Sequence, residues 1–289
     1  MKKPVIGFIG QGFIGRNYAN DFDNRGYQVI RYAAEDPYRG NKELIKECDV
    51  VFIAVPTPTT SQGFDDSIVR KVVKLVGKGK IAVIKSTMLP GSTESIQKIN
   101  PGIYILHSPE FLVAKNAAHD AAHPTRNIIG IPKRTPLYKK KARQVLSLLP
   151  KAPFEIVCSS REAELIKYAG NNFLYTKVLF MNVLYDLAMA LGVKWDVIRD
   201  SMEADSRLGN SHFDPIHDSG RGAGGPCFIK DFAAFKNLYK DIVGDKHGIE
   251  MLAKLESKNV DLLLATQKDL GLLEGVYGKK ILNKKRRTK

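Results

Sequence analysis

The chain has 289 residues, 44% of them hydrophobic, and a formal net charge of +15. This length suits one large domain or two modest ones, and it is sufficient to bury a core without disulfide or metal staples. No apolar run is long enough to cross a bilayer, and the cysteines (Cys48, Cys158 and Cys227) are odd in number and too widely spaced for a disulfide framework. We therefore expect a globular protein of a reducing compartment, the cytoplasm, without a membrane partner.

Much of the positive charge lies in the C-terminal segment 279–289, KKILNKKRRTK, which has seven basic residues and no acidic one. Such runs are typical of solvated, disordered tails, and we expect a basic disordered tail here. The remaining charge fits a protein that handles anionic small molecules. Nucleic-acid binding has only the charge in its favour, so we expect no nucleic-acid partner. No cysteine or histidine cluster indicates a metal site.

The first half of the chain alternates short apolar runs with helical patterns such as that of residues 66–79. The apolar runs are rich in Val and Ile, are bounded by Gly, Pro or polar residues, and cover residues 5–10, 27–34, 48–56, 81–87, 102–109 and 126–132. Runs of this kind are typical of strands. Their alternation with helices predicts an α/β fold with a mostly parallel sheet covered by helices.

The pattern changes near residue 158, where one long helical stretch begins. Ser159 and Glu162 form a capping-box start, and Gly192 provides a stop. Two shorter helical segments and a glycine-rich loop between them follow, at residues 194–205, 231–245 and 218–231, respectively. We expect this second part, residues 159–278, to be all-helical.

The N-terminal strand runs into the motif Gly10-x-Gly12-x-x-Gly15 at the start of a helix. In such a turn the first glycine permits the bend, the second admits a pyrophosphate, and the third packs helix against strand. The helix N-terminus then faces the phosphates. The predicted cofactor-binding residues of this turn are Gly10, Gly12, Phe13, Ile14 and Gly15. We expect an NAD(P)-binding, Rossmann-like domain over residues 1–158.

The sequence leaves the choice between NAD and NADP open. A carboxylate at the end of the second strand normally binds the ribose of NAD. Here Ala33 and Ala34 stand at that point, and Glu35 and Asp36 come slightly late. Arg31 lies close by, but no arginine directly follows the gap to favour NADP.

Two polar residues on the long helix, Lys167 and Asn171, are four residues apart and so share one face. In one interpretation, the lysine extends its charged end to solvent beside an unrelated amide. In the other, the cation and the amide dipole are both directed at a developing oxyanion. Spacing alone does not decide between these.

The stretch GGPCFIKD adds a second chemical group, the thiol of Cys227. Lys230 and Asp231 follow it, and a nearby cation favours the thiolate. Gly224 and Gly225 precede it and allow a substrate to approach the backbone. A cysteine in such a setting can trap an aldehyde and hold a thioester after hydride loss. We expect the other two cysteines to be inert and buried.

These motifs together resemble the UDP-glucose 6-dehydrogenase family, whose members oxidise a sugar C6 alcohol to a carboxylate with NAD. The matching stretches occur in order: GFIGQGFIG, VFIAVPTPTT, IKSTMLPGST, SPEFL, EAELIKYAGNNFLYTKVLFMN, DSRLG and GGPCFIKD. They cover most of residues 4–231. The resemblance implies a nucleotide-sugar dehydrogenase that acts as a homodimer, with residues 159–278 as its dimerisation and catalytic domain.

The resemblance also implies roles for individual residues. Cys227 corresponds to the nucleophile, and Lys167 and Asn171 to the groups that stabilise the oxyanion. The water-positioning or basic groups would be Asp231 and Thr87, and Glu110 would assist thioester hydrolysis. Further expected cofactor contacts are Pro56, Thr57, Thr87 and Lys230. The substrate would contact Phe111, Leu112, Lys167, Asn171, Gly224, Gly225 and Arg207, the last across a dimer interface.

The chain departs from the family pattern at several points. Ala114 stands where the family has a glutamate, and Ile229 where it has a proline. The ribose-binding carboxylate is replaced, and the span between the second and third predicted strands is short. The sequence ends before the third domain that holds uridine diphosphate in this family. We therefore expect a short form with an intact chemical centre.

The best single substrate expectation is UDP-glucose, and other nucleotide sugars remain open. One alternative is a single-step β-hydroxyacid dehydrogenase, which shares the dinucleotide domain and the Lys-x-x-x-Asn pair but needs no thiol. A second is a non-catalytic nucleotide-binding protein that lost its substrate domain.

Overall fold

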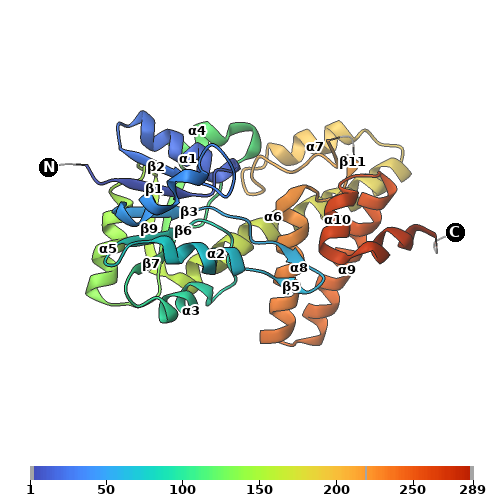
Figure 1. Cartoon of the computed structure of the whole chain (residues 1–289). Helices are drawn as coiled ribbons and strands as arrows, with labels where there is room; N and C mark the ends of the chain where they lie inside the picture. The colour runs from blue at the N-terminus through green and yellow to red at the C-terminus, as the bar shows by residue number, and fades with distance from the viewer. Residues whose placement is uncertain (1–2, 219, 287–289) are drawn as a thin grey trace. The chain divides into compact units, whose positions relative to one another are not determined.

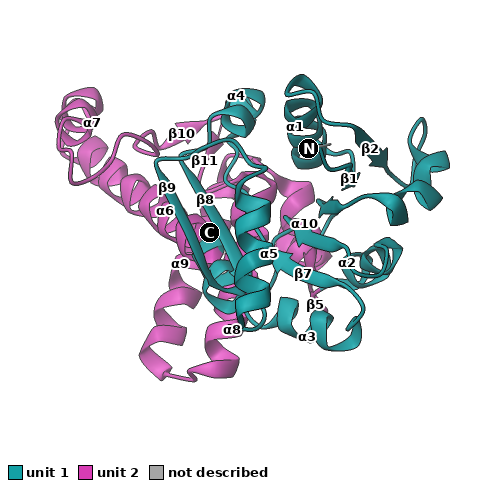
Figure 2. Cartoon of the chain, turned by 90° about the vertical axis from the view of Figure 1, so that its left-hand side faces the viewer, with its two compact units in different colours: residues 1–57, 65–167 teal, residues 58–64, 168–289 magenta. Residues whose placement is uncertain are grey.

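The computed structural model describes residues 3–218 and 220–286. The chain forms two compact units, which Figure 2 distinguishes by colour: unit 1 comprises residues 1–57 and 65–167, and unit 2 comprises residues 58–64 and 168–289. The division lies inside the long helix rather than before it, at Lys167 and Tyr168. The short segment 58–64 leaves unit 1 and joins unit 2.

Unit 1 is built on a seven-stranded sheet with the order β2-β1-β3-β6-β7-β8-β9. The strands are β1 (Ile6–Ile9), β2 (Val29–Tyr32), β3 (Val50–Ile53), β6 (Ile81–Ile84), β7 (Tyr104–His107), β8 (Arg126–Ile131) and β9 (Phe154–Ser159). All neighbours pair in parallel except β7 and β8. The predicted α/β fold with a mostly parallel sheet is therefore confirmed. The Val- and Ile-rich runs are its strands, which are mostly buried except for the half-buried edge strand β2.

Strand β9 was not predicted from the sequence. Its residues FEIVCS lead directly into the long helix, and the prediction placed the helical stretch from residue 158. Unlike the central strands, β9 is an edge strand whose residues are exposed or half-buried. A continuous apolar run, the signal for the other strands, is therefore missing here.

The helical elements of unit 1 connect successive strands. They are α1 (Phe13–Asn24), η1 (Arg39–Glu47), α2 (Ser67–Val72), η2 (Val73–Leu75), α3 (Ser92–Ile99), η3 (Ala114–Asn116), α4 (Ala117–Ala122) and α5 (Pro136–Leu146). The helix expected over residues 66–79 is thus divided into α2 and η2. Packing around β1 is aromatic: Phe8 stacks on Phe52 with ring centroids 5.1 Å apart and meets Phe22 edge-on at 5.6 Å.

Helix α6 (Ser160–Ala190) is the predicted long helix, with 31 residues. The capping box is present: Ser159 N donates to Glu162 Oε2 at 2.6 Å, and Glu162 N donates to Ser159 Oγ at 3.3 Å. Gly192 adopts φ 68° just beyond the end of the helix, the left-handed conformation that stops helices. Both predicted helix signals are confirmed.

Unit 2 is mainly helical (Figure 1). Its elements are β4 (Thr59–Thr60), β5 (Gly63–Phe64), most of α6, α7 (Trp195–Glu203), β10 (Ile216–His217), β11 (Gly220–Arg221), α8 (Gly225–Ile242), α9 (Lys246–Ala265), α10 (Leu270–Tyr277) and η4 (Lys279–Arg286). Tyr175 of α6 stacks on Phe232 of α8 with ring centroids 3.9 Å apart. Helix α8 begins earlier than predicted, so the cysteine lies in its first turn and not in a loop.

The segment expected to be a disordered tail differs from that expectation over its first eight residues. Lys279–Arg286 forms the 3-10 helix η4. Ile281 and Leu282 pack against the apolar cluster that contains Leu273 and Val276. These two apolar side chains interrupt the basic run and are partly buried in unit 2. Residues 287–289 lie outside the described residues.

Helix α6 is the one helix of the described residues that is long and apolar enough to pass a composition test for a membrane span. Buried helices of water-soluble proteins pass the same test, and 33% of the apolar window is buried inside this chain. Exposed apolar residues on this helix include Phe173, Phe180 and Leu187. The helix therefore has an apolar face that the chain alone leaves uncovered.

Candidate active site

The glycine-rich turn between β1 and α1 has the geometry of a dinucleotide-binding turn. Gly10 adopts φ 91°, and a Cβ there would lie 2.2 Å from the carbonyl oxygen of Ala54. A Cβ on Gly15 would lie 1.9 Å from the carbonyl oxygen of Gly10. Neither residue can carry a side chain, whereas nothing lies within 4 Å of a Cβ built on Gly12. The backbone at Gly12 is therefore open to a ligand, and the residues fit the pyrophosphate of NAD at the N-terminus of α1.

The predicted cofactor residues that follow β3 and β6 come together. Thr57 donates to the carbonyl oxygen of Thr87 at 2.8 Å. Ser86 donates to the carbonyl oxygen of Val55 at 2.7 Å and accepts from Val55 N at 3.0 Å. Because β1, β3 and β6 are parallel neighbours, these residues share the carboxyl-end edge of the sheet with the glycine-rich turn. This edge is where open α/β sheets bind their ligands.

Arg31, the cation nearest to the missing ribose carboxylate, is already engaged. Its guanidinium donates to Asn20 Oδ1 at 2.8 Å and forms an ion pair with Asp23, both on α1. An arginine held in this way is not directed at a 2′-phosphate, so the geometry adds nothing in favour of NADP.

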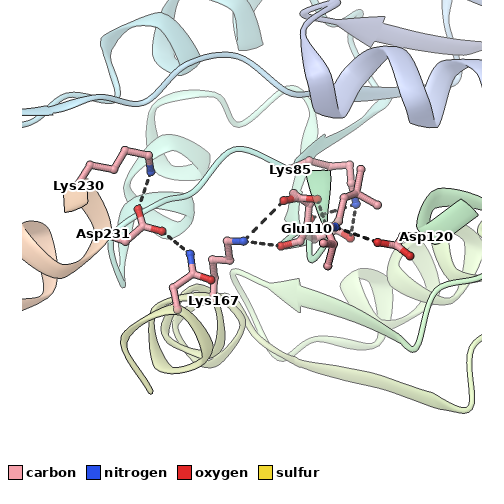
Figure 3. Close-up of polar contacts among 10 residues, drawn as sticks. Lys85, Glu110, Asp120, Lys167, Lys230 and Asp231 are labelled. Carbon is pink, nitrogen blue, oxygen red and sulfur yellow. Dashed lines mark hydrogen bonds and ion pairs between the residues drawn. The ribbon is translucent and has the colours of Figure 1, made fainter. Parts of the chain in front are cut away.

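A buried charge network lies at the end of β7 in unit 1. Figure 3 shows the Lys167 ammonium pointing toward Glu110; Nζ donates to the carbonyl oxygen of Glu110 at 2.8 Å and lies 3.6 Å from its Oε1. Glu110 Oε2 accepts from Leu112 N at 2.7 Å. The Lys167 ammonium also lies 5.7 Å from the ring centroid of Phe111. The structure thus brings together four predicted residues, and it makes the lysine a buried, partnered cation and not a snorkelling one.

Glu164, one turn before Lys167, attaches α6 to the start of α3. It accepts hydrogen bonds from Gly91 N at 2.6 Å and from Thr93 N at 2.8 Å. Burial raises the pKa of Glu164 to about 7. This attachment fixes the part of α6 that carries Lys167.

Lys85, at the end of β6, belongs to the same network and was missed by the sequence analysis. Its side chain is buried; Nζ lies 3.4 Å from both Ser108 O and Ser108 Oγ and 4.1 Å from the ring centroid of Tyr18. The pKa of Lys85 is lowered to about 8, mainly by burial; Glu110 opposes this shift and Lys167 adds to it. In the sequence, nothing distinguishes a buried lysine at the end of a predicted strand from a surface lysine.

His107, the last residue of β7, is fully buried nearby. Neither of its ring nitrogens has a hydrogen-bond partner among the described residues. Burial and the charge of Lys85 lower the pKa of His107 to about 3. The histidine is therefore neutral and buried close to Lys85.

A second group of site residues lies in unit 2. Asn171 Nδ2 donates to Asp231 Oδ2 at 2.6 Å, and Lys230 Nζ contacts Asp231 Oδ1 at 2.5 Å (Figure 3). Asp231 is 1% exposed. Both carboxylate oxygens therefore have partners, and Asn171 and Lys230 fix the carboxylate in place. The predicted pairing of Asn171 with Lys167 on one face of α6 follows from their spacing on a continuous helix.

The three cysteines differ sharply in environment. Cys227 is exposed, in the first turn of α8, where the positive end of a helix dipole favours negative charge. Cys48 is buried and Cys158 half-buried, and burial raises the pKa of each thiol to about 11. Cys227 is thus the accessible cysteine, whereas burial disfavours the thiolate form of Cys48 and Cys158.

The glycines before Cys227 differ in what surrounds them. Gly225 adopts φ 79°, and nothing lies within 4 Å of a Cβ built on it. A Cβ on Gly224 would lie 2.1 Å from Asp269 Oδ2. Gly224 is therefore required for packing against Asp269, which the sequence analysis did not identify, while Gly225 borders open space.

Arg207, the predicted substrate contact, lies in an exposed loop of unit 2. It forms an ion pair with Asp205, two residues earlier, at 2.5 Å, and 86% of its side chain is exposed. No other predicted site residue contacts it in the described part of the chain. A cavity of ≈ 470 Å³ in unit 1 is lined by other residues, among them Arg134, Arg143 and Cys158, and contains no predicted site residue.

Two family models match the chain. The NAD-binding domain of the UDP-glucose/GDP-mannose dehydrogenase family matches residues 38–146, and the central domain of the same family matches residues 161–259. The chain belongs to the UDP-glucose/GDP-mannose dehydrogenase family. It therefore has this family's NAD-binding domain, which confirms NAD as the expected cofactor. The matched ranges include the Lys167, Asn171 and Cys227 positions, and the glycine-rich turn precedes them.

Individual relatives of the chain belong to the same family. A putative UDP-glucose 6-dehydrogenase, YtcA, of Bacillus subtilis is 33% identical over 207 residues, which cover 68% of this chain and 47% of the relative. A UDP-glucose 6-dehydrogenase of Rickettsia conorii is 32% identical over 210 residues, covering 70% and 47%. The chain thus spans about half the length of the curated relatives it matches.

A solved structure has the same fold. A UDP-glucose dehydrogenase from Pyrobaculum islandicum superposes with a TM-score of 0.77 at 24% identity, covering 91% of this chain and 70% of that one. The 3-hydroxyisobutyrate dehydrogenase of Mycobacterium tuberculosis has a TM-score of 0.66 at 18% identity and is covered over 96% of its length. The fold alone therefore does not distinguish a nucleotide-sugar dehydrogenase from a hydroxyacid dehydrogenase.

Proposed function

We propose that the chain is a nucleotide-sugar dehydrogenase that oxidises a C6 alcohol to a carboxylate in two NAD-dependent steps, with UDP-glucose as the best single substrate. The observation that carries this proposal is the exposed Cys227 thiol in the first turn of α8, four residues before the fixed carboxylate of Asp231. Family membership and the glycine-rich turn support the cofactor. When bound, NAD supplies the hydride acceptor for each oxidation.

In the first half of the proposed reaction, the alcohol loses a hydride and a proton and becomes an aldehyde. The Cys227 sulfur then adds to the aldehyde carbon to form a thiohemiacetal. Negative charge develops on the former carbonyl oxygen. The Lys167 ammonium and the Asn171 amide would stabilise that charge, because both are donors fixed in advance by buried partners.

In the second half, the thiohemiacetal loses a hydride and becomes a thioester on Cys227. Water then attacks the acyl carbon of the thioester, the C–S bond breaks with the Cys227 thiolate as the leaving group, and the carboxylate is released as the product. Asp231 or Thr87 would position the water, and Glu110 would assist the hydrolysis. The fixed orientation of Asp231, held on both carboxylate oxygens, supports such a positioning role.

The main alternative is a single-step β-hydroxyacid dehydrogenase, which the structural similarity to 3-hydroxyisobutyrate dehydrogenase keeps open. That chemistry has no use for an exposed thiol at Cys227. A non-catalytic nucleotide-binding protein is the other alternative, and it has no use for the buried Lys167–Glu110 network.

A panel of nucleotide sugars with NAD and NADP, followed by absorbance of the reduced nicotinamide, tests the proposal. We expect NAD-dependent turnover, with two reduced cofactors for each uronic acid. One reduced cofactor per substrate, with an aldehyde or keto acid product, supports the single-step alternative. Binding of NAD without turnover on any sugar of the panel supports the non-catalytic one.

We also propose that the protein acts as a homodimer in the cytoplasm. Phe173, Phe180 and Leu187 follow one another at seven-residue spacing on α6 and are 70%, 57% and 54% exposed. Seven-residue spacing places side chains along one face of a helix. A second copy of the chain would cover this face. Light scattering should find a dimer at micromolar concentration, and Phe180→Asp should shift it toward monomer, whereas the exposed Lys151→Asp should not.

A further inference from the structure

The backbone that leads into Cys227 is held by side chains from a later part of the chain. Ala223 N donates to Asn259 Oδ1 at 2.7 Å, and Asn259 Nδ2 donates to the carbonyl oxygen of Ala223 at 3.0 Å. Asn259, on α9, is 2% exposed. Lys268 Nζ lies 3.4 Å from the carbonyl oxygen of Gly222 and donates to that of His217 at 2.8 Å. Residues of α9 and of the stretch that follows it thus reach several points of the loop.

Of these contacts, the one made by Asp269 is closest in sequence to Cys227. Its Oδ2 accepts from Gly225 N at 2.7 Å, and Gly225 is the first residue of α8. The first amides of a helix have no partner within the helix, so this carboxylate satisfies a donor that would otherwise need water. Asp269 itself adopts φ 55°, an uncommon conformation for a non-glycine residue. Packing holds it there, since Gly224 leaves room for its carboxylate.

We propose that Asp269, assisted by Asn259, is a positioning residue for Cys227. Gly222 and Gly225 both adopt positive φ and give the loop little stiffness of its own. The two side chains replace that stiffness by fixing the backbone immediately before and at the first residue of α8. Cys227 lies two residues further on, so its orientation depends on this anchoring. Asp269 lies beyond residue 259, where the match to the family's central domain ends.

Amide hydrogen exchange tests the anchoring directly. Loss of a hydrogen bond to a charged group costs about 1.5–3 kcal/mol, which corresponds to a factor of about ten to a hundred. We therefore expect exchange of the Gly225 amide to be about ten- to a hundredfold faster in Asp269→Ala. Asp269→Asn keeps an acceptor oxygen and should recover most of the protection.

Alkylation of Cys227 by iodoacetamide provides a readout of the thiol that needs no substrate. At pH 8 the other two cysteines should react slowly, because burial raises the pKa of Cys48 and of Cys158 to about 11. The alkylation rate of Cys227 should change severalfold in Asp269→Ala and stay near that of the unmodified protein in Asp269→Asn. Asp245→Ala is the matched control: it removes a carboxylate that caps α9 by accepting from Gly248 N at 2.5 Å in the same unit.

The catalytic meaning of the anchor rests on the proposed function, and a kinetic readout addresses it separately. In Asp269→Ala we expect a fall in kcat with an unchanged NAD dissociation constant, because the glycine-rich turn is untouched. If the unmodified protein turns over no nucleotide sugar, the proposed function fails, while the exchange and alkylation results still decide the anchoring.

Two outcomes overturn the proposal. One is Gly225 exchange within twofold of the unmodified protein in Asp269→Ala; the other is an alkylation rate that responds equally to Asp245→Ala. If Asp269→Ala does not fold, Gly224→Ala replaces it, because its added methyl would lie 2.1 Å from Asp269 Oδ2 and displace that carboxylate without removing it. Unchanged exchange and alkylation in Gly224→Ala overturn the proposal equally.

Discussion

The two groups of site residues are held in different ways. In unit 1, Lys85, Glu110 and Lys167 are buried side chains that fix one another through charge. In unit 2, Cys227 is exposed, and its position depends on backbone contacts from Asn259 and Asp269. Burial strengthens the field of a charged group but makes its ionisation costly. An exposed thiol avoids that cost and needs an ordered backbone instead.

The largest expected effect comes from the exposed group. Cys227→Ser keeps the shape but provides a hydroxyl that is barely ionised near neutral pH. Uronate production should fall by several orders of magnitude, as when a covalent nucleophile is removed, while NAD affinity stays within a few-fold. Mass spectrometry of quenched reactions should find a sugar adduct on Cys227 of the unmodified protein. Cys158→Ser is the control, and full activity of Cys227→Ser would contradict the covalent mechanism.

A smaller loss is expected from the buried group. Lys167→Met removes the cation whose Nζ donates to the Glu110 carbonyl oxygen. Loss of one such fixed donor lowers kcat by about a hundred- to a thousandfold in related chemistry. The single-turnover rate should fall by that amount, with NAD binding unchanged. A fall confined to KM would place Lys167 in ground-state binding only, and a melting curve separates either result from unfolding.

The cost of burying the Lys85 charge should appear in the pH dependence of the unfolding free energy. Lys85 has its pKa lowered from 10.5 to about 8 by burial, so between these values the unfolded chain binds more protons than the folded one. Stability should therefore rise with pH through this window. The shift corresponds to about 3 kcal/mol, present as a cost below pH 8. Lys85→Met should raise the unfolding free energy near pH 7 by that order and remove the pH dependence.

Lys80→Met is the matched control for Lys85→Met. It removes a lysine just before the same strand, where the side chain is 32% exposed and paired with Asp49 at 2.7 Å. Partly exposed pairs of this kind contribute about 0–1 kcal/mol. Urea unfolding at pH 7 and pH 10 measures both variants. A destabilised Lys85→Met at both values would show that the network gains more from the lysine than its burial costs.

The smallest effect is expected at the C-terminus. The sequence predicted a disordered tail over residues 279–289, but Ile281 and Leu282 pack in unit 2, so we expect the dispensable segment to begin after them. Deleting residues 284–289 should leave turnover within twofold and the melting temperature nearly unchanged. A large loss of turnover would mean that the basic residues bind the substrate's diphosphate.

Local sequence patterns predicted the fold class, the capping box of α6 and the glycine-rich turn, because each of these depends on residues that are close together in the chain. The chemical candidates Lys167, Asn171, Cys227 and Asp231 came from motifs in order, and the contacts that link Asn171 with Asp231 agree with that grouping. The edge strand β9 was missed because it lacks the continuous apolar run of the central strands.

Only the tertiary structure identified Lys85, Asn259 and Asp269. Each is an ordinary polar residue in the sequence, and each matters because a segment distant in sequence lies against it: Ser108 and Tyr18 at Lys85, Ala223 at Asn259, and Gly225 at Asp269. Burial and long-range hydrogen bonds have no periodicity along the chain. The sequence therefore determined which chemical groups are present, and the packing of distant segments decided which are buried, which are exposed and what holds them.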